Sequence, residues 1–565
     1  MKSRWLPTVG ALLVYALPFV RGDTIILKDG TEVDGIILIQ SSTKILIKQG
    51  AATKMIPLED VASIAKSPST PEIESPPSGT SAPASRANSE RHDPLLDSTV
   101  MVSATLSEPD FTKPWTKSPP REEHGSGAVI AGNRILTSAH LVNYASDIEV
   151  RGASGSKIVA QIVALDTTLD LAVLKLSDDN FFANHPPVEF MPSVPNSGET
   201  VSVYGLSENY NSINQLSPSM AALNFEYYTS NYLQLMIRLN TRLDPWMSGG
   251  PAASAAGSVF GITCSRQDEG QIFSFVIPSE VILRFLDEVK TGVRKRKSML
   301  YDQTQPFENP ALRAFLGAGP GEHGMVVTSI QSKQEVNTFR DWDIITGVSG
   351  EEVDDQGMVH FGLTHRVNFA YEYQRLGGIR ETLTFVKRGR VALQIFFTPE
   401  IDRALLIPDL KGDLPAYFIL GPMVFSTATI QMFSQLAKTA QMISYLGIRG
   451  SPLLKRREEK PAFPGEQLVF VPSPFFPHPL ARGYTEPTFS VVKAVNEIPI
   501  KNLGHLVTVM RDSREDFVTI EFAEKFSEIL VFPRTEMIAA TEGILSDNNV
   551  RSQGSPDTMA IWNAK

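Results

Sequence analysis

The sequence predicts a mainly β protein built from several domains, and three observations support this. Short apolar runs separated by turn residues recur along the chain, as in Lys44-Ile-Leu-Ile-Lys48. At 565 residues the chain is too long for a single hydrophobic core. Hydrophobic residues make up 42% and charged residues 20%, which is typical of folded globular protein. One segment, Glu280–Val289, has instead the period of an amphipathic helix.

Composition also excludes several classes of function. The formal charge of −10 argues against nucleic-acid binding, which needs clustered positive potential. The nine histidines are scattered and no His-Glu-x-x-His motif occurs, so we expect no metal site and no cofactor. Cys264 is the only cysteine, so the chain cannot form an internal disulfide and must be stabilised by packing.

Residues 1–22 have the layout of a secretory signal peptide. Lys2 and Arg4 precede the mostly apolar stretch Leu6–Val20. An uncleaved anchor is the alternative, but the apolar core is short and the stretch contains two prolines, which favours cleavage. No later segment has the apolar length of a membrane helix. We therefore expect an exported protein, periplasmic or extracellular, without an integral membrane span.

Composition shifts divide the rest of the chain. Residues 23–66 alternate apolar and polar positions and predict a small β module. Residues 67–115 begin with a stretch rich in Pro, Ser, Ala and Thr and predict a flexible linker. Residues 116–293 contain the strand-like runs of an all-β double barrel. Two further β-rich regions follow at 300–400 and 405–545, the second with a helical insert.

Three segments carry the side chains that a serine hydrolase needs. They are Thr137-Ser-Ala-His140, Asp166-Thr-Thr-Leu-Asp170 and Pro245-Trp-Met-Ser-Gly-Gly-Pro251. His140 is the predicted general base, Asp170 would hold its imidazole in the required tautomer, and Ser248 would be the nucleophile. Each residue alone is a weak signal, but the three surrounding motifs in this order are specific.

The chain resembles the Deg/HtrA family of serine proteases. The motifs that carry this resemblance are Gly125-Ser-Gly-Ala-Val-Ile130, Ile135-Leu-Thr-Ser-Ala-His140, Asp170-Leu-Ala-Val-Leu174, Ser248-Gly-Gly-Pro251, Gly257-Ser-Val-Phe-Gly-Ile262 and Phe273-Ser-Phe-Val-Ile-Pro278. The resemblance implies a chymotrypsin-like double β-barrel over 116–293. It further implies an ATP-independent serine endopeptidase that acts on unfolded or damaged proteins in protein quality control, and a homo-oligomer.

The downstream regions resemble PDZ domains. Gly324-Met-Val-Val-Thr-Ser-Ile330 and Trp342-Asp-Ile-Ile345 are similar to a first PDZ domain, over 300–400. Leu414-Pro-Ala-Tyr-Phe-Ile-Leu-Gly421 and Val492-Lys-Ala-Val-Asn496 are similar to the second PDZ-like domain of the plant-type branch. This implies binding of peptide segments by strand addition, with Ala314–Gly321 as the candidate loop for a terminal carboxylate.

The nucleophile loop departs from the family pattern. The resemblance implies an oxyanion hole made by the backbone amides of Ser248 and Trp246, but position 246 normally holds a glycine. A tryptophan could force the loop into a collapsed form, and Met247 replaces a polar residue that normally braces it. Two interpretations stay open. The protein is a slow, substrate-gated protease, which the intact triad favours, or a catalytically impaired pseudoprotease serving as a peptide-binding or chaperone-like scaffold.

Arg242 is a candidate for the substrate pocket. It lies six residues before Ser248, where this fold places the base of the specificity pocket and where the family usually has a small residue. If it points inward, the arginine favours an acidic P1 side chain through a charge-assisted pair. If it points outward, it is a surface residue without a role in specificity.

Overall fold

The computed structural model describes residues 23–29, 31–40, 44–49, 52–57, 60–65, 93–152, 155, 157–206, 213–229, 232–268, 271–292, 298–331, 338–362, 364–376, 381–401 and 403–564. The predicted signal peptide lies outside these residues, as does most of the Pro- and Ser-rich linker. The chain divides into two units, Met1–Glu90 and Arg91–Lys565. The mainly β fold class is confirmed. Within the described parts of the chain, no helix is long and apolar enough to cross a membrane.

The first unit contains a five-stranded antiparallel sheet in the order β4-β3-β2-β1-β5. Its strands are β1 Asp23–Leu27, β2 Glu32–Gln40, β3 Lys44–Gln49, β4 Ala52–Pro57 and β5 Val61–Ala65. Val33 and Ile56 are buried in it. Neighbouring strands in this order all pair antiparallel, as expected of the small β module predicted for residues 23–66.

The second unit begins with a closed barrel in the order β10-β11-β8-β7-β6-β9. Its strands are β6 Thr99–Leu106, β7 Arg121–Ile130, β8 Arg134–Thr137, β9 Ala145–Arg151, β10 Ile158–Asp166 and β11 Leu171–Leu176. The short helix α1 (Pro94–Ser98) precedes them, capped by the Asp93 carboxylate, which accepts a hydrogen bond from Leu95 N.

Strand β6 corrects the prediction that residues 67–115 form a linker throughout. Val100, Val102 and Leu106 are fully buried at alternating positions. β6 pairs with both β7 and β9, so the barrel closes only through it. The period-2 apolar pattern of Thr99–Leu106 was the signal, and the adjacent Pro- and Ser-rich stretch hid it.

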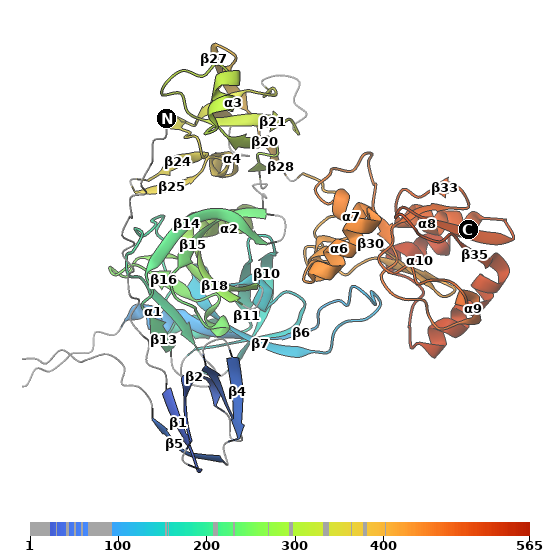
Figure 1. Ribbon diagram of the computed structural model, residues 1–565, viewed down its shortest axis with the longest axis horizontal. Helices are drawn as coiled ribbons and strands as arrows, with labels where there is room; N and C mark the ends of the chain where they lie inside the picture. Colours follow the sequence, from blue (N-terminus) through green and yellow to red (C-terminus); the bar gives the residue numbers. More distant parts are fainter. Residues whose placement is uncertain are drawn as a thin grey trace, which may run out of the picture. The chain divides into compact units, whose positions relative to one another are not determined.

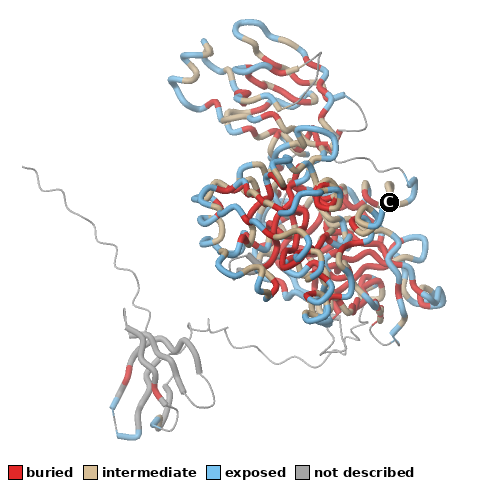
Figure 2. Tube along the Cα trace, turned by 90° about the vertical axis from the view of Figure 1, so that its right-hand side faces the viewer, coloured by how far each residue is buried: buried red, intermediate tan, exposed pale blue. Residues whose placement is uncertain are grey.

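A seven-stranded antiparallel sheet follows, in the order β13-β12-β16-β17-β18-β15-β14. Its strands are β12 Ser202–Leu206, β13 Ile213–Leu216, β14 Met220–Thr229, β15 Tyr232–Leu239, β16 Pro251–Ala253, β17 Val259–Asp268 and β18 Gln271–Pro278. The predicted helix is confirmed as α2 (Ser279–Thr291), which ends at Gly292 with φ +67°. Buried residues gather inside the folded parts (Figure 2), and Cys264 is one of them.

The next region has a sheet in the order β20-β21-β22-β26-β27, with β23 paired to β22. Its elements are β20 Gln303–Pro306, α3 Pro310–Phe315, β21 Met325–Ser329, β22 Ile344–Val348, β23 Glu351–Glu352, α4 Ala370–Leu376, β26 Thr382–Arg388 and β27 Val391–Phe397. Strands β24 (Met358–Phe361) and β25 (His365–Asn368) form a hairpin, and β19 (Ser298–Met299) pairs with β28 (Glu400–Ile401).

The C-terminal region has two sheets, β29-β30-β31 and β33-β32-β34-β35 (Figure 1). The strands are β29 Tyr417–Leu420, β30 Met423–Thr427, β31 Val469–Phe470, β32 Val492–Val495, β33 Ile498–Pro499, β34 Phe517–Phe522 and β35 Leu530–Pro533. The helices are α5 Ile430–Leu436, α6 Ala440–Arg449, α7 Pro452–Lys455, α8 Leu503–Asp512, α9 Arg534–Asp547 and α10 Pro556–Trp562. The predicted helical insert corresponds to α5 and α6.

Candidate active site

His140 and Asp170 meet because the strands that carry them are neighbours. His140 lies in a short 3-10 turn after β8, and Asp170 directly precedes β11. Strands β8 and β11 pair antiparallel, with Ala172 opposite Thr137, so the end of one lies beside the start of the other. The imidazole Nδ1 lies 2.8 Å from Asp170 Oδ2, and the His140 amide donates to Oδ1 at 2.8 Å.

This contact sets the state of the imidazole. Because the carboxylate accepts from Nδ1, the neutral ring carries its proton there and leaves Nε2 available as a base. Burial lowers the pKa of His140, but the charge and the hydrogen bond of Asp170 outweigh it, so the pKa lies above its ordinary value. The Asp170 side chain is 6% exposed, whereas that of His140 is 42% exposed and open to solvent on its other side.

Ser248 lies at the end of a 3-10 turn, Pro245–Met247, and is fully buried. Backbone hydrogen bonds hold the loop, among them Gly249 N to Thr263 O at 2.7 Å and Ser126 N to Ser248 O at 2.8 Å. Gly249 has φ +90°, and a Cβ atom there would clash with Ser126 O, so only glycine fits.

The hydroxyl of Ser248 does not contact His140. Ser248 Oγ accepts a hydrogen bond from Ser265 N at 3.2 Å. Neither Ser248 nor His140, both in the described part of the chain, makes a hydrogen bond to the other. The structure therefore joins two of the three predicted site residues directly, and holds the third in another hydrogen bond.

The predicted oxyanion hole is partly closed. Ser248 N donates to Pro245 O at 3.0 Å, so one of its two amides is used inside the loop. Trp246 is partly buried against the core, and its ring lies 3.0 Å from where a Cβ at Gly205 would stand. Met247 is fully buried, which explains an apolar residue at a position that is usually polar.

Ser126, on β7, holds the nucleophile loop, a role that the sequence did not predict. Its Oγ donates to the carbonyl of Trp246 at 2.8 Å and accepts from Leu206 N at 3.1 Å. It therefore ties the 3-10 turn to β12. The serine between two glycines, Gly125 and Gly127, was the signal, because both glycines stand where a Cβ would clash with neighbouring side chains.

Arg242 has an exposed side chain. It borders a surface pocket of about 590 Å³ together with Arg238 and Phe273. The next residue, Leu243, is the buried one, and its amide donates to Ser274 Oγ at 2.7 Å. This exposure corresponds to the outward alternative, and a role for Arg242 in specificity stays a prediction.

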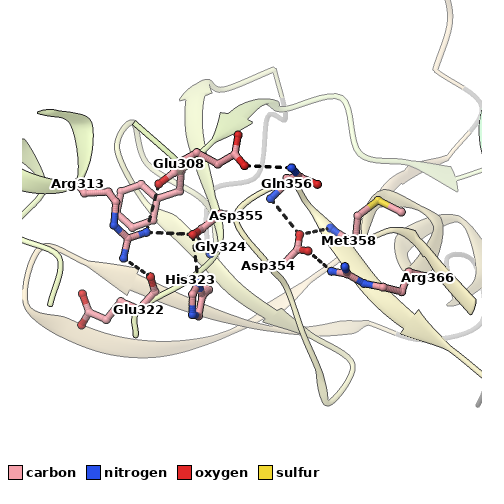
Figure 3. A network of polar contacts seen from close by, with 11 residues as sticks. Glu308, Arg313, Glu322, His323, Gly324, Asp354, Asp355, Gln356, Met358 and Arg366 are labelled. Carbon is pink, nitrogen blue, oxygen red and sulfur yellow. Dashed lines mark hydrogen bonds and ion pairs between the residues drawn. The ribbon is translucent and has the colours of Figure 1, made fainter. Parts of the chain in front are cut away.

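The loop expected to capture a carboxylate is already closed by internal hydrogen bonds. Gly319 N donates to the Glu322 carboxylate at 2.8 Å, and Ala318 N donates to Arg313 O at 2.9 Å. Figure 3 shows the network beside it, in which Asp355 accepts from Arg313 at 3.2 Å and from His323 Nδ1 at 3.1 Å. These contacts argue against Ala314–Gly321 as a carboxylate-binding loop. Among the described residues, no cluster of His, Cys, Asp or Glu is arranged to hold a metal ion.

Comparison with known proteins identifies the two domain types. The family described as trypsin-like peptidase domain matches residues 125–262, and the PDZ domain family matches residues 408–557. The chain is 25% identical to Protease Do-like 2, chloroplastic, of Arabidopsis thaliana over 474 residues, which cover 82% of this chain and 76% of that one. It is 25% identical to Protease Do-like 4, mitochondrial, of the same plant over 473 residues, covering 82% and 86%.

Solved structures give a weaker likeness. HtrA-type protease AlgW with decapeptide matches with a TM-score of 0.41 and 17% identity, over 55% of this chain and 98% of that one. The assignment of the domains and of the homologues therefore rests on the sequence matches. By these matches the chain has a trypsin-like peptidase domain and a PDZ domain, and its homologues are Deg/HtrA Do-like proteases of the plant branch.

Proposed function

We propose that this protein is an exported, ATP-independent serine endopeptidase that cleaves unfolded or damaged proteins in protein quality control. His140 is the general base, Asp170 orients it and Ser248 is the nucleophile. The observation that carries the proposal is the contact of 2.8 Å between His140 Nδ1 and the buried Asp170 carboxylate. A paired imidazole that keeps a solvent-facing side, in a trypsin-like domain, is suited to take a proton from a serine hydroxyl.

The chemistry requires two local rearrangements of the nucleophile loop. Ser248 Oγ must leave Ser265 N and turn toward His140 Nε2, which takes the hydroxyl proton as Oγ attacks the peptide carbonyl. Ser248 N must leave Pro245 O so that it and Trp246 N can stabilise the oxyanion. His140 then gives the proton to the leaving amine, and water hydrolyses the acyl-enzyme. The described conformation therefore corresponds to a resting enzyme that substrate has to open.

Substrate class, assembly and location have different support. The relatives are named Do-like proteases. The resemblance to the Deg/HtrA family implies unfolded or damaged proteins as substrates, peptide segments at the PDZ domain and a homo-oligomeric assembly. The relatives are named chloroplastic, mitochondrial and, in Pseudomonas fluorescens, periplasmic. Export of this chain rests on the predicted signal segment 1–22, and we favour the periplasm or the cell exterior.

A fluorophosphonate probe tests the proposal directly. Residues 23–565 are labelled with and without casein, beside Ser248→Ala and the control Ser265→Ala. Ser265 supplies only its amide to Ser248, so Ser265→Ala keeps that hydrogen bond and should still be labelled. We expect labelling that depends on Ser248 and increases with casein. No labelling in any condition would refute the peptidase and favour the catalytically impaired scaffold.

A further inference from the structure

Within the second unit, a cavity of about 790 Å³ lies beside the two turns that carry His140 and Asp170. Asn143 and Tyr144, which follow His140, form one part of its wall, and Thr168, which precedes Asp170, forms another. The opposite wall comes from residues 403–413 and from helix α5. A ligand in this cavity would therefore touch both turns that hold the catalytic pair.

Two contacts join the opposite walls of this cavity. Tyr144 Oη donates a hydrogen bond to the carbonyl of Asp413 at 3.0 Å. Phe111, on the loop between β6 and β7, is 7% exposed and packs in a hydrophobic cluster with Leu406 and Met432. Pockets for metabolite-sized ligands have volumes of about 300–1,000 Å³. The cavity is therefore a preformed space for a small molecule, and it is larger than a single inorganic anion needs.

Arg403 lines the cavity with a guanidinium that protein groups satisfy only in part. Its side chain is 6% exposed. Nη2 donates to Gln331 Oε1 at 3.4 Å, and the buried Nε has no hydrogen-bond partner among the described residues. The guanidinium also stacks on the ring of Tyr301, 4.4 Å from its centre. Since a guanidinium has five N–H donors, most of the hydrogen-bonding capacity of Arg403 is left for another group.

The charges nearest to Arg403 indicate that this group is an anion. Glu400 Oε2 lies 4.0 Å from Arg403 Nε, beyond hydrogen-bond distance, whereas Glu400 Oε1 binds Lys460 Nζ at 2.6 Å. One carboxylate thus faces two cations, and a ligand carboxylate would supply the missing negative charge. The other charged residues of the wall are exposed or half-buried, where water screens them: Glu108, Asp409, Lys411, Asp413 and Lys438.

The remaining wall indicates what else the ligand carries. Asn143 Oδ1 is buried and has no hydrogen-bond partner among the described residues, so it can accept from a hydroxyl or an N–H of the ligand. Apolar side chains that line the cavity would contact an apolar body, among them Met299, Leu405 and Ile430.

We propose that this cavity binds a small organic acid that has an apolar body and a hydroxyl or N–H group. The carboxylate pairs with Arg403, and the hydroxyl or N–H donates to Asn143. The inference rests on the contacts of the cavity alone, so it does not depend on the proposed peptidase activity.

Calorimetric titration of the full chain tests this inference. All proteins carry Ser248→Ala, so the result is separate from the labelling experiment that tests the peptidase. The probe is 3-phenyllactate, which has a carboxylate, a hydroxyl and an apolar ring. Two further compounds each remove one feature: 3-phenyllactamide lacks the charge, and inorganic phosphate lacks the apolar body.

Two variants alter the cavity wall without a large change in volume. Arg403→Gln removes the positive charge, and Asn143→Asp keeps the shape of the side chain and adds a negative charge. The matched control is Arg457→Gln. Arg457 also stacks on an aromatic ring, 5.3 Å from the centre of Phe433, but it does not line the cavity.

We expect 3-phenyllactate to bind with a Kd of roughly 1 mM or below, the range of a ligand of this size. The amide and phosphate should bind about tenfold more weakly or worse, because each lacks one set of contacts. Arg403→Gln and Asn143→Asp should both weaken binding of the acid by about tenfold, and Arg457→Gln should leave it unchanged.

Three results would overturn the proposal: no saturable binding of the acid, equal binding of the acid and its amide, or full binding by the folded cavity variants. If Arg403→Gln does not fold, Asn143→Asp decides by itself. Phosphate that binds as tightly as the organic acid would identify an inorganic-anion site and overturn the ligand class.

Discussion

Catalysis requires the amide and the hydroxyl of Ser248, and both make hydrogen bonds within the peptidase domain. Its amide donates to Pro245 O and its hydroxyl accepts from Ser265 N. The Trp246 carbonyl is held by Ser126 Oγ, and its ring packs near Gly205. Each hydrogen bond contributes about 1 kcal/mol, so the closed loop is stable by a margin that bound substrate could overcome.

Glycine at position 246 should make the resting site easier to open. Trp246→Gly removes the ring that packs near Gly205 and restores the backbone freedom that an oxyanion loop needs. We expect labelling by a fluorophosphonate to accelerate by about 10²-fold, the range of one oxyanion donor. Trp246→Phe is the control and should stay slow. Equal rates for both variants would mean that the tryptophan does not hold the loop closed.

The raised pKa of His140 sets the expected pH dependence. The base must be neutral, so kcat/KM should fall as pH decreases through a pKa that lies above 6.5. Asp170→Asn removes the interaction that raises the pKa, so the acid limb should move to lower pH while kcat drops by roughly 10³–10⁴-fold. Peptide hydrolysis between about pH 5 and 9 measures both. An acid limb at the same pH in the variant would contradict the role of Asp170.

At the scale of elements, one ion pair with a buried carboxylate joins two strands of the 300–400 region. Asp343, just before β22, is 1% exposed and accepts two hydrogen bonds from Arg388 at the end of β26, at 2.7 and 2.8 Å. Its Oδ2 also accepts from Arg340 N at 2.7 Å. A buried carboxylate with this many donors holds the two strand ends together.

Loss of this carboxylate should destabilise the region. Asp343→Ala removes the carboxylate that accepts from Arg388 and from Arg340 N, and we expect the free energy of unfolding to fall by about 2 kcal/mol, the range of hydrogen bonds to a charged group. Glu521→Gln is the control, because its pair with Lys493 is exposed and contributes less than about 1 kcal/mol. Hydrogen exchange of β22 and β26 measures the change locally. Unchanged exchange in Asp343→Ala would refute the structural role of the pair.

At the scale of the whole molecule, the peptidase unit begins earlier in the sequence than its motifs do. Strand β6 pairs on both sides inside a closed barrel. A chain without it would expose two unpaired strand edges and the apolar side chains beneath them. The unit boundary at Arg91 agrees with this topology.

Two truncations test where this unit begins. Residues 91–565 should fold and react with the probe as the longer chain does, because they include β6. Residues 107–565 should aggregate or unfold, since the barrel can no longer close. Circular dichroism and size-exclusion chromatography distinguish the two results. If residues 107–565 were folded and reactive, the peptidase domain would not need β6, as the prediction of a linker over residues 67–115 implies.

Prediction from the sequence succeeded where a pattern is local. The helical period of Glu280–Val289 and the insert near residue 430 both correspond to helices, because side-chain spacing within ten residues carries that information. It failed at β6, whose apolar alternation is as clear but stands beside low-complexity sequence. For Ala314–Gly321 the sequence could not tell that the amide of Gly319 donates to the carboxylate of Glu322 in the same loop, and carboxylate binding by this loop stays a prediction.

The sequence by itself determined which candidate catalytic groups the chain contains, because a histidine, an aspartate and a serine in motifs of fixed order are recognisable without coordinates. Only the tertiary structure decided which hydrogen bonds those groups make: His140 with Asp170, but Ser248 with Ser265 and Pro245. Only the fold also joined Tyr417 to Ser555, 138 positions apart. Each of these hydrogen bonds contributes only about 1 kcal/mol. Which of them form depends on backbone angles and long-range packing, and no local sequence pattern encodes either.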